Sequence, residues 1–266
     1  MFLEHEKNGI IYTSSSIIPF PHGFMTRYGG VSEGDFASLN LGSERGDNYD
    51  HVKENYRRLC ALFGYGEDDC CVTKQVHGNR VLRVDENDRH KSMSHVPYET
   101  DGIVTSRRKL PLMCFTADCV PALAADTRGH AAAAVHCGWR SSVSDILNNM
   151  VLEMEALGAE RKDICVAFGP SIGKCCFETD SDVPEAVRCY LSGDTEGLWE
   201  ERADGKFMVD LRKANARRLL QLGIPEDNID ISSECTMCLH TKYWSNRYTV
   251  KNHLQRGNLA SVIVLE

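Results

Sequence analysis

The chain has 266 residues, 42% of them hydrophobic, so it is long and apolar enough to bury a substantial core. Its 38 acidic and 30 basic residues give a formal net charge of -8, and no block of like charge occurs along the sequence. Because phosphate contacts need a basic face, this charge balance disfavours duplex nucleic acid as a partner.

The N-terminal stretch lacks the pattern of a signal peptide, because acidic residues stand near its start and Tyr12, Thr13 and serines interrupt its apolar run. The most apolar region, residues 110–134, contains charged side chains and has too short a continuous apolar run to cross a bilayer. The 12 cysteines are spread over a long chain, which favours a reducing compartment. We therefore expect a soluble cytoplasmic protein with no membrane association and no obligate protein partner.

Hydrophobic periodicity predicts a mixed α/β protein. An apolar stripe over residues 50–63 predicts a helix capped by Asp50, and short apolar runs between turn residues predict strands. The expected strands are residues 70–74, 80–85, 102–105, 110–116, 120–125, 131–135, 164–168 and 261–265. The other expected helices are residues 141–157, ended by Gly158, then 182–191 and 210–222. No repeat or linker divides the chain, so we predict one domain over residues 1–266, a layered α/β sandwich.

Three separate segments carry candidate metal ligands. His77 follows a strand-like run and precedes Gly78 at a turn, which predicts a position at a strand end. Cys119 lies between two apolar runs and close to Pro121, where we expect the backbone to leave regular pairing because proline cannot donate a ladder hydrogen bond. His136 ends an apolar run just before a predicted helix, and ligand contacts in α/β folds gather at such positions.

Two imidazoles and one thiolate are suitable ligands for zinc, which takes three protein ligands and a water when it is catalytic. The spacing alone leaves other interpretations open. The two histidines could be hydrogen-bonded residues beside an inert cysteine, or Cys119 could be the nucleophile of a Cys-His hydrolase with His77 or His136 as its base. A structural ion in a binding module is a third possibility, with Cys235 or Cys238 as the fourth ligand.

Several of the remaining cysteines lie beside polar or glycine-rich residues. These are Cys137, the adjacent pair Cys175 and Cys176, and the Cys235-x-x-Cys238 spacing. Most others stand inside apolar runs, where a free cysteine behaves as a small hydrophobic residue. From the sequence we retain only Cys119 as a strong candidate ligand.

The ordered motifs resemble the laccase-domain proteins, also called the multicopper polyphenol oxidase-like or YfiH family. The resemblance covers nearly the whole chain and includes HGFMTRYGGVSEGDFASLNLG (22–42), KQVHGNRV (74–81), ETDGIVTS (99–106), TADCVPALAAD (116–126), HCGWRSSV (136–143), FGPSIGKCCFE (168–178) and SSECTMC (232–238). In that family the histidine of the KQVHG-like segment, the cysteine of ADC and the histidine of HCGWR form a metal site. The resemblance thus implies His77, Cys119 and His136 as metal ligands and catalytic centre, in a sandwich of the YfiH type.

The same resemblance implies a zinc-dependent purine nucleoside phosphorylase that acts on adenosine, inosine and S-methyl-5′-thioadenosine and also deaminates adenosine. The expected partners are then a purine nucleoside and phosphate. The older family name implies copper-dependent oxidation of phenols, and some bacterial members are linked to editing of peptidoglycan precursors. Multicopper chemistry is disfavoured because the 10 histidines include no His-x-His pair, although Cu²⁺ could replace Zn²⁺ at the same site.

Phosphorolysis requires a phosphate site, and the planar fork of arginine suits phosphate. Arg140, which follows a metal ligand and precedes a helix, and Arg27 are the candidate phosphate ligands. The other candidate substrate-binding residues are Asn40, Gln75, Asp118, Cys175 and Glu178. Each has a structural alternative: the two amides could satisfy loop backbone, the aspartate could orient a histidine ligand, the glutamate could lie on the surface and the cysteine could be buried.

The C-terminal region departs from the family pattern. Many members have Thr-Gly-Arg before the last strand, whereas this chain has Arg256-Gly257-Asn258, so the arginine is displaced by two positions. If this arginine contacts substrate, we expect an altered substrate preference; if it only braces the last strand, no catalytic consequence follows. Arg247 keeps its place.

Overall fold

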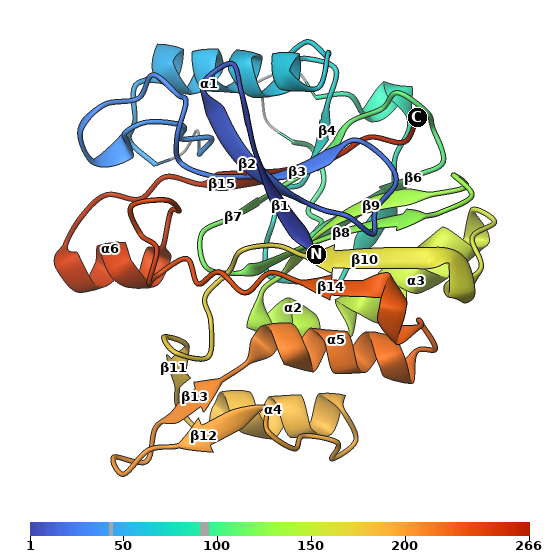
Figure 1. Ribbon diagram of the computed structural model, residues 1–266, viewed down its shortest axis with the longest axis vertical. Helices are drawn as coiled ribbons and strands as arrows, with labels where there is room; N and C mark the ends of the chain where they lie inside the picture. The colour runs from blue at the N-terminus through green and yellow to red at the C-terminus, as the bar shows by residue number, and fades with distance from the viewer. Residues whose placement is uncertain (43–44, 91–95) are drawn as a thin grey trace.

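The computed structural model describes residues 1–42, 45–90 and 96–266. Two six-stranded sheets pack face to face, and helices cover their outer surfaces (Figure 1). The architecture is therefore a layered α/β sandwich, which confirms the predicted fold class. No helix in the described ranges has both the length and the apolar character that a membrane span requires.

The first sheet joins the two ends of the chain. Its strands, in spatial order, are β1 (Phe2–Lys7), β2 (Ile10–Ser15), β3 (His22–Met25), β15 (Leu259–Ile263), β7 (Leu112–Thr116) and β4 (Cys71–Val72). All neighbouring strands are antiparallel except β4 and β7, which run parallel. Helix α1 (Tyr49–Leu62) covers the outer face of this sheet through its buried stripe, which includes Val52, Tyr56 and Leu59.

The second sheet forms the centre of the molecule. Its strands, in spatial order, are β14 (Ile229–Ile231), β10 (Ile164–Phe168), β8 (Val120–Asp126), β9 (Ala132–Cys137), β6 (Gly102–Thr105) and β5 (Val81–Arg83). Alternate residues of β8 face opposite ways: Ala122 and Ala124 pack toward the helices, whereas Leu123 packs toward the first sheet. Because both faces are covered, the strand is apolar throughout rather than alternating with polar residues.

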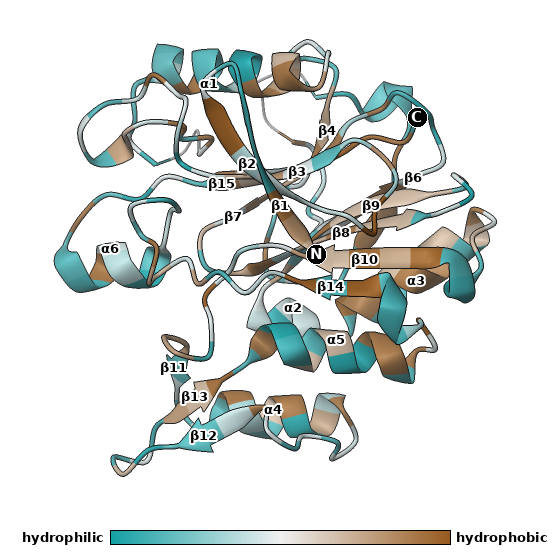
Figure 2. Ribbon diagram, viewed as in Figure 1, coloured by the Kyte–Doolittle hydropathy of each residue, from teal (hydrophilic) through white to brown (hydrophobic). Residues whose placement is uncertain are grey.

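The remaining helices and a small third sheet complete the fold. Helices α2 (Trp139–Val143), α3 (Ile146–Ala156) and α5 (Leu211–Gln221) lie on the outer side of the second sheet. Beyond them, α4 (Asp182–Tyr190) packs on β11 (Glu178–Thr179), β13 (Phe207–Val209) and β12 (Trp199–Glu201), and α6 (Asn246–Asn252) precedes the last strand. Figure 2 shows hydrophobic residues concentrated in the central strands and hydrophilic ones on the outer turns of the helices.

Short 3-10 turns connect several of these elements. They are η1 (Gly34–Phe36), η2 (Glu86–Asp88), η3 (Arg161–Asp163) and η4 (Glu226–Asn228).

The predicted strands at residues 102–105 and 164–168 are confirmed with the same bounds, and the other predicted strands and three of the four predicted helices occur with shifted ends. The cap of α1 was assigned wrongly to Asp50: the side chain of Asn48 accepts hydrogen bonds from the N–H groups of Asp50 and His51. The strands β1, β2, β3 and β14, the small sheet and α6 were not predicted. These elements are short, and the strands among them depend on pairing with partners that are distant in sequence or on tight turns.

The continuous helix predicted over residues 141–157 is wrong, because Ser144 and Asp145 separate α2 from α3. Asp145 adopts a left-handed backbone conformation with φ of 68°, and its carboxylate accepts a hydrogen bond of 2.9 Å from Arg218 on α5. The carbonyl of Ser144 accepts a hydrogen bond from the Asn79 side chain. Contacts with distant segments thus stabilise the break between α2 and α3. The apolar residues keep helical spacing across the break, so the sequence pattern does not reveal it.

Candidate metal centre

Neighbouring strands of the second sheet bring Cys119 and His136 together. Cys119 stands directly before β8, and His136 is the second-last residue of β9, where it lies opposite Pro121. Pro121 therefore lies inside a regular strand, and the predicted loss of pairing at this residue is wrong. His136 directs its N–H to the carbonyl of Asp101 at 2.7 Å, so it does not donate to β8, and the Pro121 carbonyl accepts from Gly169 at 3.0 Å.

His77 lies in the loop between β4 and β5. The predicted position at a strand end is therefore wrong. The backbone of His77 has a left-handed φ of 60°. The carboxylate of Asp101 accepts hydrogen bonds from the N–H groups of Val76, His77 and Gly78 at 3.0, 3.0 and 2.8 Å. One buried carboxylate therefore fixes the loop conformation that points His77 toward Cys119.

The three candidate ligands converge on one point. One donor atom from each of His77, Cys119 and His136 lies within 4.8 Å of the others. The Cys119 Sγ atom is 3.9 Å from Nε2 of His77, and the two imidazole rings are perpendicular with centroids 4.8 Å apart. Segments 42 and 17 residues apart in the sequence thus form a compact donor set.

Asp101 also orients the ring of His136. Its Oδ1 atom lies 2.7 Å from Nδ1 of His136, and both side chains are buried. This hydrogen bond leaves Nε2 of His136 as the free donor atom, as in metal sites where a carboxylate holds the ligating histidine. Sequence reasoning considered Asp118 for this role and gave none to Asp101, although the residue belongs to the ETDG segment.

The electrostatics of the centre favour a thiolate. Burial raises the pKa of Cys119, but His136 and His77 lower it by more, to about 6. Burial lowers the pKa of His136, whereas the Cys119 thiolate and the Asp101 carboxylate raise it to about 9. Since the thiolate is the form of cysteine that binds metals, the charge distribution prepares Cys119 for this role.

This donor set fits a catalytic transition-metal ion. Two imidazoles and one thiolate would supply three of the four ligands that zinc takes, and all three residues line the pocket, from which a fourth ligand could come. The same nitrogen and sulfur atoms also bind copper, and more tightly in general, so the donor set does not by itself select the metal.

Gly138 closes the space behind the three ligands. A Cβ atom at this position would lie 2.8 Å from Cδ2 of His77, 3.2 Å from Cε1 of His136 and 3.5 Å from Sγ of Cys119. Its backbone angles, φ of −60° and ψ of 157°, suit any residue. The glycine is therefore required for the packing of the ligands and not for the conformation of the chain.

We expect Gly138→Ala to weaken zinc binding by about 10-fold or more with little loss of folding stability, because the added methyl group displaces His77 from its ligating position. Zinc competition with a chromophoric chelator measures the affinity. Gly78→Ala is the matched control: its Cβ would meet Asp101 and Val76 at an ordinary 3.6 Å. Equal zinc affinity in the two variants would contradict this account of Gly138.

A pocket of about 280 Å³ opens onto the metal centre. Its wall is mostly polar and charged, with apolar and aromatic side chains on one part of it. The lining residues are Leu41, Gly42, Arg45, Tyr56, Val72, Thr73, Lys74, Gln75, His77, His90, Val96, Phe115, Thr116, Ala117, Cys119, His136, Arg256 and Asn258.

Two arginines give this pocket a positive charge. Neither Arg45 nor Arg256 forms an ion pair with a carboxylate of the described residues, and Arg256 donates a hydrogen bond only to the neutral amide of Asn246. Burial and the neighbouring Arg45 lower the pKa of Arg256. Two guanidinium groups without carboxylate partners make this part of the pocket suitable for an anion.

Neither of the arginines predicted from the sequence lines this pocket. Arg140 is exposed, and its guanidinium stacks on the Trp139 ring. Arg27 donates hydrogen bonds to the carbonyls of Ala37 and His240, so it braces loops. The arginine displaced in the C-terminal motif, Arg256, lines the pocket instead.

Gln75 lines the pocket, whereas Asn40 is buried behind it, and both side chains brace the backbone of the pocket wall. Oδ1 of Asn40 accepts hydrogen bonds from the N–H groups of Gly42 and Asn258, at 2.8 and 3.0 Å, and so ties the Arg256 segment to residues 41–42. Gln75 lines the pocket, and its amide exchanges hydrogen bonds with the backbone N–H and carbonyl of Phe115. The structural alternative considered for both amides therefore fits their contacts.

Asp118, Cys175 and Glu178 do not line the pocket. Asp118 is buried and accepts hydrogen bonds of 2.6 Å from the Thr236 hydroxyl and from the backbone N–H of Arg247. Glu178 forms an ion pair with Arg202 at 2.9 Å. Cys175 belongs to a separate group of cysteines and is exposed.

Comparison with known proteins places this chain in a family. Residues 21–266 match the family model described as multi-copper polyphenol oxidoreductase laccase. The chain belongs to this family. The resemblance drawn from the sequence motifs is thereby confirmed.

Members of the family have related names and the same fold. A purine nucleoside phosphorylase, YlmD of Geobacillus stearothermophilus, is 34% identical over 230 residues, which cover 85% of this chain and 84% of the relative. The crystal structure of YlmD from that organism superposes with a TM-score of 0.91 at 30% identity and covers 98% of both chains. An adenosine deaminase, RL5, from an unknown prokaryotic organism is 33% identical over 215 residues, 80% of this chain and 82% of the relative.

Proposed function

We propose that the protein is a zinc-dependent purine nucleoside phosphorylase that also deaminates adenosine. One observation carries the proposal: the ligand set His77, Cys119 and His136 borders the same pocket as two arginines that have no carboxylate partner among the described residues. The names of the relatives, purine nucleoside phosphorylase and adenosine deaminase, support the same pair of activities.

Phosphorolysis makes two demands that this pocket can meet. A phosphate oxygen attacks C1′ of the ribose, the bond from C1′ to N9 of the purine breaks, and the purine leaves with the electron pair and takes up a proton. Arg45 and Arg256 would bind the phosphate and hold it in place for this attack. Tyr56, Phe115 and Val72 offer apolar surface to the flat base.

The metal centre would meet another requirement of the reaction, because it would stabilise the negative charge that develops on the leaving purine. A zinc ion bound by His77, Cys119 and His136 would supply a Lewis acid for the departing purine and, in deamination, for the attack of water at C6. Asp101 keeps the Nδ1 proton on His136 and so presents Nε2 to the ion.

We also infer a single catalytic domain over residues 1–266. We infer a cytoplasmic location as well, because 12 free cysteines favour a reducing compartment.

The proposal is tested with zinc-loaded protein and adenosine, with and without phosphate. We expect adenine and ribose 1-phosphate to form only when phosphate is present and inosine to form in either case. Chelation should abolish both reactions and zinc should restore them. No product from the zinc-loaded protein would overturn the proposal.

A second prediction follows from the position of Arg256 in the pocket and of Arg140 outside it. Arg256→Ala should raise the KM for phosphate by about 10-fold or more and change the KM for adenosine less, because it removes one of two unpaired cations from the pocket. Arg140→Ala is the matched control, since this exposed arginine only stacks on Trp139. Initial rates over a range of phosphate concentrations and, separately, of adenosine concentrations give the two constants. A larger effect in Arg140→Ala would show that the phosphate site was assigned to the wrong arginine.

A Cys-His hydrolase acting on a peptidoglycan precursor is the alternative, because a low-pKa Cys119 beside a histidine held by Asp101 is also the arrangement of such enzymes. Metal removal separates the two functions. A hydrolase of this type keeps its activity after chelation and loses it on alkylation of Cys119. The family name also suggests copper-dependent oxidation of phenols. To test this activity, metal-free protein is loaded with copper and its rate of phenol oxidation is measured.

A further inference from the structure

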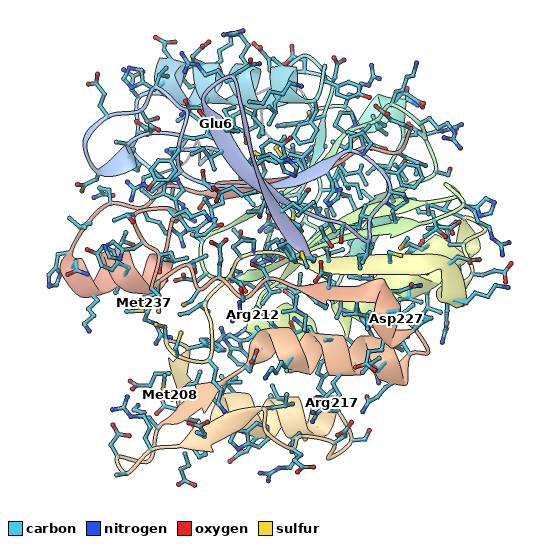
Figure 3. The ribbon with its side chains drawn as sticks, in the orientation of Figure 1. Glu6, Met208, Arg212, Arg217, Asp227 and Met237 are labelled. Carbon is cyan, nitrogen blue, oxygen red and sulfur yellow. The ribbon has the colours of Figure 1, made fainter. Side chains whose placement is uncertain are left out.

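Four cysteines from two distant segments meet outside the pocket. Cys175 and Cys176 lie in the turn between β10 and β11, and Cys235 and Cys238 lie in the turn between β14 and α6. One Sγ atom from each lies within 4.8 Å of the others, and Cys238 is 3.5 Å from Cys175 and 3.4 Å from Cys176. Figure 3 labels Met237, which belongs to the same turn and lies between α6 and β11.

These distances suit four thiolates around one ion. With zinc–sulfur bonds of about 2.3 Å, a tetrahedron places its sulfur atoms about 3.8 Å apart. Cys235 and Cys238 have the Cys-x-x-Cys spacing that commonly supplies two ligands to zinc. A disulfide would use only two of the four sulfur atoms and would not account for the convergence of all four.

The backbone around the sulfur atoms is arranged for negative charge. The N–H of Gly173 donates a hydrogen bond of 3.2 Å to Sγ of Cys235. The carbonyl of Gly173 accepts from the N–H groups of Cys176 and Phe177, each at 2.9 Å, and this turn brings two adjacent cysteines to the same side. N–H donors of this kind stabilise metal-bound thiolates.

Two arginines beside the cluster can balance its charge. Arg247 donates hydrogen bonds to the carbonyls of Cys176 and Glu178, at 3.5 and 3.0 Å. Arg212, labelled in Figure 3, donates to the carbonyls of Ser232 and Glu234, at 2.6 and 3.0 Å. Within the described ranges neither arginine forms an ion pair with a carboxylate. A divalent ion with four thiolates carries two negative charges, and these guanidinium groups lie at the right place to offset them.

We propose that Cys175, Cys176, Cys235 and Cys238 bind one structural zinc ion that is separate from the metal centre of the pocket. Four protein ligands close the coordination shell, which is typical of structural sites. The ion would tie the β10–β11 turn to the β14–α6 turn. The proposal does not depend on the proposed enzymatic function.

The cluster also has a direct connection to the metal centre. Thr236, which lies between the two cysteines of the Cys-x-x-Cys segment, donates a hydrogen bond of 2.6 Å to Asp118. Asp118 has a left-handed φ of 90° and directly precedes Cys119. An ion at the cluster would therefore brace the loop that positions one ligand of the other centre.

Metal content tests the proposal. We expect about two zinc ions per chain in the native protein and in Cys189→Ser, an exposed cysteine of α4 outside the cluster, and about one in Cys175→Ser/Cys238→Ser. Plasma mass spectrometry against protein concentration gives the count. An equal zinc content of the native protein and of Cys175→Ser/Cys238→Ser would overturn the proposal, whatever the pocket centre holds.

A second measurement leaves the cluster intact, so it holds even if the double variant does not fold. Cys119→Ala loaded with Co²⁺ should show the strong near-ultraviolet charge-transfer absorption of cobalt bound to several thiolates, together with tetrahedral d–d bands. Lack of cobalt binding, or a mass lower by two hydrogens that maps to a disulfide among the four cysteines, would contradict a metal site.

Discussion

Cys119→Ala is expected to lower the rate of adenosine phosphorolysis by more than about 100-fold, because loss of a residue that only supports a metal ligand already costs about 10- to 100-fold in other metal sites. The substitution removes the only sulfur from the donor set and leaves two imidazoles. Adenine and ribose 1-phosphate are measured together with the zinc bound per chain. Both quantities should fall.

The control for this experiment is Cys189→Ala, which removes an exposed cysteine of α4 far along the chain from the centre. Circular dichroism and thermal unfolding show whether each variant keeps its fold. Undiminished product from Cys119→Ala would remove the basis for a catalytic role of the metal centre. Loss of product with zinc fully bound would instead indicate that the thiolate acts on the substrate.

Asp101→Asn is expected to have the second largest effect, a fall of about 10- to 100-fold in zinc affinity and in kcat/KM. The carboxylate of Asp101 accepts hydrogen bonds from three consecutive N–H groups of the His77 loop and from Nδ1 of His136. An amide provides one acceptor oxygen in place of two, and its NH₂ group faces donors. The variant should therefore release His77 and weaken the orientation of His136.

The chain contains a matched control for this aspartate. Asp126 is also fully buried, accepts from two backbone N–H groups and lies 2.5 Å from Nδ1 of a histidine, His130, but it stands at the far end of β8. Asp126→Asn should lower the free energy of unfolding, because it disturbs buried hydrogen bonds, and leave zinc affinity unchanged. Equal losses of zinc affinity in the two variants would show that the effect of Asp101 is general destabilisation.

Much of the centre could be anticipated from local patterns. The apolar runs at β8 and β9 predicted two buried strands, with Cys119 just before the first and His136 near the end of the second, as the structure has them. The stripe of α1 was also recognised, because one helix face must be apolar to cover a sheet. These features depend on residues that are close in sequence, so the hydrophobic periodicity predicts them.

The parts that failed depend on contacts between distant segments. The left-handed Asp145 that breaks the helix pairs with Arg218, which lies 73 residues later. Pro121 is tolerated in a central strand because its pair with His136 is not hydrogen-bonded and needs no N–H from the proline: His136 directs its own N–H to Asp101 on the other side. No local pattern contains these partners, so the sequence predicted a helix and a break in the wrong places.

The amino-acid sequence by itself determined the α/β class and the covered central strands, because hydrophobic period is a property of short segments. Its family motifs also pointed to His77, Cys119 and His136 as candidate metal ligands, which the spacing alone had left open. Only the tertiary structure decided how these residues work together. It showed that Asp101 holds two of the three ligands, that Arg45 and Arg256 rather than Arg27 and Arg140 line the pocket, and that four cysteines form a second cluster. Each of these features depends on hydrogen bonds between loops that are distant in sequence. The spacing of residues along the chain does not contain these contacts.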